Sequence, residues 1–152
     1  MNPYIQGNIT KLKVLLPGER KKAWQLVGTP QGMGKWFPLE CLGKIAKGET
    51  IEFIWVAGAP EKFKVLDVKE NESWEMEWVE GAKVKYHLES ESPVIFSLEV
   101  SYPDNEQGKA TQLIEVAGWT FYLANLKSVV MGGPDLRRKN SSYGWKEGFI
   151  DG

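Results

Sequence analysis

The chain of 152 residues suffices for one domain with a sizeable core, and 42% hydrophobic with 26% charged residues is ordinary for a globular protein. Its 19 lysines and arginines nearly balance 20 aspartates and glutamates, so the charge does not indicate nucleic-acid binding. No stretch approaches the ~20 apolar residues of a membrane span, and the first residues do not resemble a secretory signal. Because a single Cys41 allows no internal disulfide, we expect a cytoplasmic protein without membrane insertion.

The first predicted element is a strand over residues 8–16. Its apolar face holds Thr10, Leu12, Val14 and Leu16, and two lysines lie on the other face. We then expect two short helices, because each start and stop is marked by a suitable residue.

The first short helix is predicted to begin at Pro17 and to end at about Val27, before Gly28. The second is predicted to begin at Thr29 and Pro30, a capping residue followed by a proline suited to the first turn. Two glycines make this second helix brief.

Residues 39–117 carry the signals of strands and turns. Apolar side chains alternate at Ile51–Trp55, Trp74–Trp78, Val84–Leu88, Val94–Val100 and, in a last predicted strand, at Gln112, Ile114 and Val116. Turn residues separate these runs, which predicts consecutive antiparallel strands.

Residues 119–131 switch to the helical period. Trp119, Tyr122, Leu123 and Leu126 share one face, whereas Phe121 falls on the opposite side, where it is either exposed or covered by the tail. Gly132-Gly133-Pro134 ends this helix.

The predicted fold class is therefore α+β. A curved antiparallel sheet of six to eight strands wraps around a long C-terminal helix, and two short helices follow the first strand. Residues 1–138 form this domain, and residues 139–152 form a tail that packs on it or is partly flexible. A sheet wider than one helix is expected to leave an apolar cavity between the two.

Short motifs in this order resemble a known superfamily. They are Pro17 and Trp24, Thr29-Pro30 leading to Trp36-Phe37, Gly48, the segment Trp74–Trp78, Gly118-Trp119, and the segment Gly132–Arg137. Residues 8–138 thus resemble the START-like (helix-grip, SRPBCC) superfamily, and within it the family similar to the C-terminal domain of the activator of the HSP-90 ATPase. Two departures stand out, a small insertion over residues 81–92 and a longer tail after Arg138.

The resemblance implies the fold more closely than the function. Relatives in this superfamily include lipid and hydrophobic-ligand binders, cyclases and co-chaperone domains. Fold analogy alone does not choose among these activities.

The residues that could carry chemistry have simpler interpretations. His87, the single histidine, is expected at the surface or packed on a strand, and Cys41 is expected to be a small buried hydrophobe. Glu75 and Glu77 alternate with apolar neighbours, which predicts a solvated outer face. We therefore expect no cofactor, no metal and no catalytic residue, although cyclisation or hydrolysis stays open.

Aromatic and sulfur side chains on the predicted inner faces are the remaining functional signal. The sequence has seven Trp, six Phe and five Tyr, and apolar pockets are commonly lined by such rings. Any one of them could simply fill the core. As ligand-binding residues we predict Trp36, Phe37, Phe53, Trp55, Trp74, Met76, Trp78, Phe96, Trp119 and Tyr122.

The predicted ligand is a lipid, isoprenoid or aromatic metabolite, oriented by the Tyr122 hydroxyl and the Trp78 indole N–H. The alternative partner is a chaperone, contacted through exposed Phe121 and Trp145. A homodimer is also left open.

Overall fold

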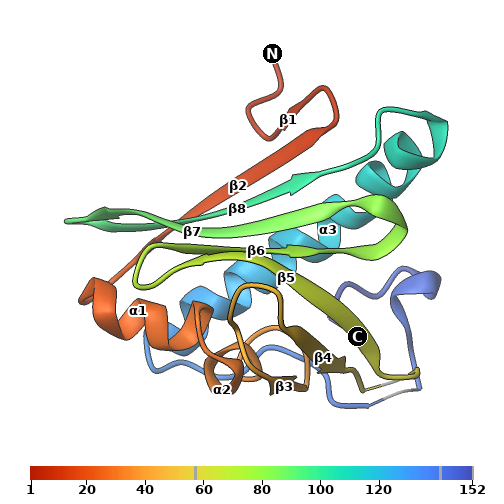
Figure 1. The fold of residues 1–152 in the computed structure, drawn as a ribbon. Helices are drawn as coiled ribbons and strands as arrows, with labels where there is room; N and C mark the ends of the chain where they lie inside the picture. The colour runs from red at the N-terminus through yellow and green to blue at the C-terminus, as the bar shows by residue number, and fades with distance from the viewer. Residues whose placement is uncertain (57, 141, 152) are drawn as a thin grey trace.

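The computed structural model describes residues 1–56, 58–140 and 142–151, and it shows an eight-stranded antiparallel sheet that curves around one long helix (Figure 1). The predicted fold class is confirmed. The strands lie in the order β1-β2-β8-β7-β6-β5-β4-β3. Their bounds are β1 Ile5–Gln6, β2 Ile9–Leu16, β3 Glu40–Gly43, β4 Thr50–Ile54, β5 Glu61–Lys69, β6 Ser73–Glu77, β7 Lys83–Glu91 and β8 Val94–Ser101.

Three α-helices complete the fold, α1 Arg20–Val27, α2 Pro30–Met33 and α3 Glu106–Val130, with short 3₁₀ turns at Val79–Gly81 and Trp145–Glu147. In Figure 1 the 25 residues of α3 run diagonally behind the sheet, and α1 and α2 lie at one end of it. Among the described residues, no helix combines the length and apolarity needed to cross a membrane.

The strand predicted over residues 8–16 is confirmed as β2. Thr10, Leu12 and Leu16 are buried on its inner face, and β2 pairs with β8 along its whole length. Because β8 also pairs with β7, the chain's first long strand is joined directly to the middle of the sheet.

The predicted start of the first short helix at Pro17 is wrong by three residues. Gly18 has φ +92°, a backbone conformation incompatible with a right-handed helix, so α1 begins only at Arg20. The second helix is confirmed. The Thr29 Oγ1 accepts a hydrogen bond of 3.0 Å from the Gly32 N–H, as an N-cap should.

The strand predicted at Gln112, Ile114 and Val116 is also wrong, because these residues lie in α3. Asn105 caps that helix, with its Oδ1 accepting from the Gly108 N–H at 2.8 Å, so the helix begins right after the turn that follows β8. Gln112 is buried while Ile114 is 59% exposed, which shows that the two do not share a face.

Residues 81–92, which are predicted to be a small insertion relative to the family pattern, lie between central strands of the sheet, and their being an insertion stays a prediction. They contain β7, which pairs with both β6 and β8 and therefore lies in the middle of the sheet. His87 is half-buried on the outer face of β7, where burial and then the nearby Lys85 lower its pKa. Its expected place on a strand surface is confirmed.

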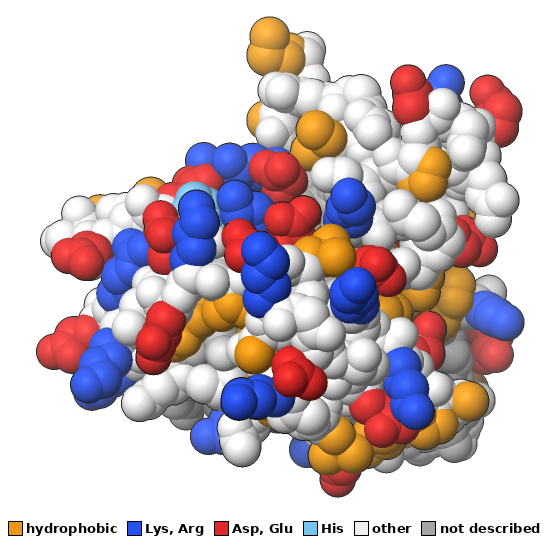
Figure 2. All heavy atoms as spheres, in the orientation of Figure 1, with side chains coloured by type: hydrophobic (Ala, Val, Ile, Leu, Met, Phe, Trp, Pro, Cys, Tyr) orange, Lys and Arg blue, Asp and Glu red, His pale blue; other side chains and the backbone are white. Residues whose placement is uncertain are grey.

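The outer face of the sheet carries interspersed charges of both signs, which Figure 2 shows across the centre of the molecule. Lys11 and Lys13 both reach Glu89, at 2.9 and 3.1 Å. Glu75 lies between the buried Trp74 and Met76 and Glu77 follows Met76, so both carboxylates are on the solvated side of β6, as predicted.

After α3 the chain turns back at Gly132, which has φ +75°. The segment beyond residue 138 gathers around Arg138, whose guanidinium lies 5.7 Å from the Tyr143 ring and 5.6 Å from the Phe149 ring. The Arg138 N–H also donates to the Asp151 carbonyl at 2.9 Å. The division into a domain and a tail stays a prediction.

Candidate functional site

Nine aromatic side chains meet between the sheet and α3, and we call them the aromatic cluster. Neighbouring ring centroids within it are 4.7–6.5 Å apart, the range of direct aromatic contact. Its members are Trp36, Phe37, Phe53, Trp55, Phe63, Trp78, Phe96, Trp119 and Tyr122.

Phe37 lies at the centre of this cluster. Its ring centroid is 4.7 Å from that of Tyr122, 5.4 Å from those of Trp55 and Trp119, and 5.5 Å from that of Phe53. These partners come from α3 and from the region of β4, whereas Phe37 itself lies in the segment between α2 and β3. One loop residue therefore joins the helix to the sheet.

Trp74 and Met76 are the two predicted site residues that lie apart from the cluster. Trp74 stacks on Tyr86 with centroids 4.5 Å apart, and the Met76 sulfur lies 4.0 Å from the Tyr86 hydroxyl. The Trp74 indole N–H donates to the Val27 carbonyl at 2.6 Å, so this pair supports the end of α1. The structure brings the other eight predicted residues together.

Three members of the cluster reach the surface, and we call Trp55, Trp78 and Tyr122 the rim. Each is half-buried, whereas Trp36, Phe37 and Phe53 are no more than 2% exposed.

Two rim residues have polar neighbours. The Trp55 indole N–H donates to the Glu61 carboxylate at 2.7 Å. The Tyr122 hydroxyl forms no hydrogen bond with the described residues, and burial raises its pKa.

Glu115, from the first half of α3, receives the other rim indole. The Trp78 N–H lies 3.1 and 3.3 Å from its two carboxylate oxygens, and the Tyr102 hydroxyl donates to one of them at 2.7 Å. The Trp119 N–H donates in turn to the Tyr102 oxygen at 3.0 Å. These four side chains form what we call the Glu115 network.

The Glu115 network contains a carboxylate without a cation. None of the ion pairs among the described residues includes Glu115. Burial raises the pKa of its carboxyl, and the nearby Glu80 adds to this, while hydrogen bonds from Tyr102 and Trp78 oppose it. Burial and then the charge of Glu115 raise the pKa of Tyr102, so Tyr102 is the hydrogen-bond donor.

Sequence reasoning missed Phe63, Tyr102 and Glu115. Phe63 lies on β5, whose alternation is interrupted by a register shift between Val65 and Asp67. Glu115 falls in the stretch predicted as a strand, where it would face away from the sheet's inner side. A helical period begun at Asn105 would have placed Glu115 four residues before Trp119, on the same face.

A second polar network holds the segment that carries Phe37. The Arg137 guanidinium donates to the carbonyls of Pro38 at 2.6 Å, Gly34 at 3.1 Å and Phe37 at 3.2 Å. Asp135 fixes the same guanidinium through contacts of 2.7 and 3.0 Å.

The fully buried Asn125 of α3 completes this arrangement. Its amide donates to the Trp36 carbonyl at 3.0 Å and to Asp135 at 3.1 Å, and its oxygen accepts from the Leu136 N–H at 2.7 Å. We call Asn125, Asp135 and Arg137 the Arg137 network.

Cys41 is buried beside Phe53, its neighbour across the β3–β4 pair, and burial raises the pKa of its thiol to about 12. The thiol is therefore neutral near pH 7, and the prediction of a buried small hydrophobe is confirmed.

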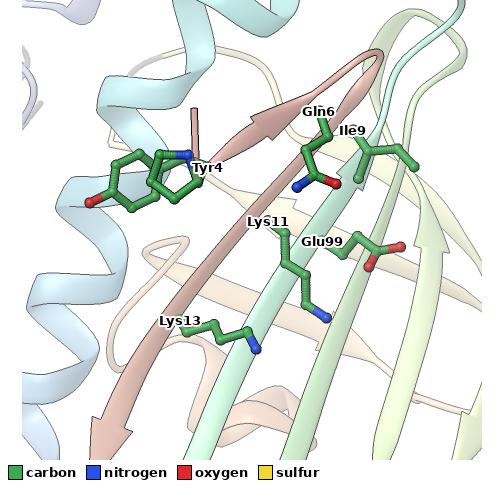
Figure 3. Close-up of a pocket in the computed structure, with 7 residues that line it drawn as sticks. Tyr4, Gln6, Ile9, Lys11, Lys13 and Glu99 are labelled. Carbon is green, nitrogen blue, oxygen red and sulfur yellow. The ribbon is translucent and has the colours of Figure 1, made fainter. Parts of the chain in front are cut away.

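Two hollows of the described surface lie away from the aromatic cluster. One, of about 550 Å³, is lined by Tyr4, Ile9, Lys11, Lys13 and other residues of β1, β2 and β8 (Figure 3). The other, of about 230 Å³, lies over β3 and β4 near Leu42. Neither is lined by a cluster residue. Where the sequence predicts a cavity, the ring of Phe37 fills the space.

No family model matches this sequence, and no curated protein is significantly similar to it. Solved structures do share its fold. SSP2350 from Staphylococcus saprophyticus is 20% identical over 86% of this chain and 95% of its own, with a TM-score of 0.70. DynU16, from the dynemicin biosynthetic locus, is 19% identical over 84% of this chain with a TM-score of 0.71, and this chain spans 49% of its length.

The solution structure of the Aha1 dimer from Colwellia psychrerythraea is 19% identical over 80% of this chain and 95% of that one, with a TM-score of 0.64. At such identities the likeness establishes the fold and not the activity. It supports the helix-grip architecture that the sequence motifs indicate.

Proposed function

We propose that this domain binds a small apolar or amphipathic molecule, such as a lipid, isoprenoid or aromatic metabolite, at the rim of the aromatic cluster. The observation that carries the proposal is the convergence of rings on Phe37, with Trp55, Trp78 and Tyr122 reaching the surface. Aromatic surfaces with a few placed polar groups are typical of small-molecule sites.

The polar groups at the rim suit an amphipathic ligand. The Tyr122 hydroxyl has no protein partner among the described residues, and Glu115 presents a carboxylate that accepts only neutral donors. A ligand with a hydroxyl or amine head group could donate to Glu115 while its apolar part lies against the rings.

Binding requires that Phe37 move, because its ring fills the space between α3 and β4. Exposing a buried phenylalanine costs about 2–3 kcal/mol, which a ligand of larger apolar area compensates. Phe37 belongs to neither a helix nor a strand, so its segment can shift without breaking sheet pairing. The Arg137 network sets how readily it does so.

The test combines native mass spectrometry of the purified protein with a thermal-shift screen of lipids and aromatic metabolites. A ligand at one hundred times its dissociation constant stabilises the native state by about 2.7 kcal/mol. We expect a ligand to raise the melting temperature of the wild type. Trp55→Ala and Trp78→Ala should each weaken the affinity for that ligand at least tenfold. Trp145→Ala, which removes an exposed tail indole, is the matched control. Equal binding by all variants, or none by the wild type, would contradict the proposal.

A co-chaperone-like role, as in the activator of the HSP-90 ATPase, is the alternative. Its support is the shared fold with the Aha1 dimer structure together with exposed apolar side chains such as Trp145. It predicts co-purification with the chaperone and a changed ATPase rate. If the chaperone neither binds nor responds, this alternative fails, whatever the outcome of the ligand screen.

A further inference from the structure

The outer face of α3 carries no charge over four turns. The exposed positions between Lys109 and Lys127 are Ala110, Leu113, Ile114, Ala117, Thr120 and Ala124. Leu113 is 73% exposed and Ile114 59% exposed, and the half-buried Phe121 adjoins them. A helix that borders water normally has a polar outer face. This face has the composition of a helix that is covered on both sides.

The charged residues at the two ends of this face are placed so that they can pair with those of a second copy of the same face. Glu106 lies one turn before Lys109, with a side chain 98% exposed and 4.0 Å from the Lys109 Nζ, and Lys127 lies at the other end of the face. The midpoint between them falls next to Ala117, which is also the centre of the uncharged stretch. Two copies packed antiparallel about Ala117 would therefore place each Glu106 opposite Lys127 of the partner subunit.

We propose that this face binds a second copy of the chain, through an antiparallel α3–α3 contact on a two-fold axis at Ala117. At 100° per residue, Glu106 and Lys127 lie on the same side of the helix face, so both ion pairs form in one arrangement. A two-fold contact uses the same surface of both copies, so that if residue i of one copy contacts residue j of the other, j of the first also contacts i of the second. The surface must therefore be complementary to itself.

The apolar side chains also match in this register. Leu113 faces Thr120 of the partner subunit, and Ile114 lies beside Phe121 of the partner subunit. Small residues occupy the axis itself, and a Cβ placed on Gly118 would meet no atom within 4 Å. The helices can therefore approach to the usual 8–10 Å between axes. One helix pair of ~30 Å makes a small interface, so we expect a weak and reversible dimer.

The first test is sedimentation velocity between about 1 and 300 µM, the range that brackets a weak interface. We expect reversible dimerisation that Leu113→Glu abolishes. Leu15→Glu is the matched control, because Leu15 is also exposed, at 53%, but lies on β2. A wild type that stays monomeric at the highest concentration would overturn the proposal.

The register has its own test. Glu106→Lys and Lys127→Glu should each weaken the dimer about tenfold, and the double variant should restore it, because the two pairs are exchanged. Ala117→Cys should form a disulfide-linked dimer on oxidation, since the two-fold axis brings both copies of this position together. Ala110→Cys should not. Equal cross-linking at both positions, or no recovery in the charge-reversed double variant, would overturn the antiparallel arrangement.

Discussion

Two carboxylates tie α3 to the rest of the molecule, but they have different partners. Toward the C-terminal end, Asp135 faces the guanidinium of Arg137 at 2.7 Å. In the first half of the helix, Glu115 accepts hydrogen bonds from Tyr102 and Trp78 and from no cation. The first network is charge-compensated and the second is not.

The difference is visible in the two pKa directions. Hydrogen bonds from Arg137 hold the pKa of Asp135 well below its usual range, whereas burial raises the pKa of Glu115. Removing the cation from a buried ion pair is strongly destabilising, whereas an uncompensated carboxylate at a surface rim is available to another donor. We therefore assign the Arg137 network to holding Phe37 in place and the Glu115 network to the binding proposal.

The largest expected effect is that of Arg137→Ala. The change leaves Asp135 partly buried without its cation and frees three carbonyls of the 34–38 segment, so the free energy of unfolding should fall by about 3–5 kcal/mol. Urea denaturation measures this. Lys139→Ala, which removes an exposed partner 3.4 Å from the same carboxylate, should cost less than about 1 kcal/mol. A similar loss in both variants would show that the buried geometry of Arg137 is unimportant.

A smaller loss is expected for Asn125→Ala. The variant leaves the Trp36 carbonyl and the Leu136 N–H without their partner in the interior, and this should cost about 2–3 kcal/mol. Ser128→Ala removes an exposed hydrogen bond of 2.7 Å to Pro134 from the same helix and should cost about 0.5–1 kcal/mol. If the two losses are equal in urea denaturation, Asn125 has no special role.

The sequence predicts the parts of this fold that depend on local pattern. The inner face of β2, the cap at Thr29 and the alternation around Trp74 are all readable, because burial of one strand face imposes a period of two. The sequence places the start of α3 too late, because an alternation of only three residues, from Gln112 to Val116, is too short to distinguish a strand from a helix. Asn105 caps the helix through a side chain that also suits a turn.

The candidate site is less predictable, because it depends on which inner faces meet. Trp74 and Trp78 lie on one face of the same short segment, yet the first stacks on Tyr86 and the second joins the cluster. Their partners come from strands and helices distant in sequence. That Phe37 fills the expected cavity is likewise a consequence of packing, which no periodicity contains.

Glu115→Gln should change the pH dependence more than the stability. The folded-state pKa of Glu115 lies above the unfolded value of 4.5, so its stabilising contribution is complete below pH 4.5 and is lost as the pH rises through the folded-state pKa. The variant lacks this loss. Its free energy of unfolding, relative to wild type, should therefore increase between pH 4 and 8.

Asp135→Asn supplies the opposite sign in the same experiment. Because the folded-state pKa of Asp135 is lowered below 3.8, its contribution is present above pH 3.8 and is lost as the pH falls toward the folded-state pKa. The difference between wild type and this variant should shrink on acidification. If both variants follow the same trend with pH, the contrast between the two networks is wrong.

The smallest expected effect is that of Trp78→Phe, which retains an aromatic ring in the cluster but removes the indole N–H. The lost hydrogen bond is long, at 3.1 and 3.3 Å, so the free energy of unfolding should fall by only about 1 kcal/mol. The Trp78 hydrogen bond lowers the pKa of Glu115, so its loss should raise that pKa. The variant should therefore lose stability at a higher pH than the wild type does. Trp55→Phe removes an indole that donates to Glu61 and not to Glu115, so the decline in stability assigned to Glu115 should stay at the same pH. A shift in both variants, or in neither, would separate Glu115 from the rim and remove the polar half of the proposed ligand site.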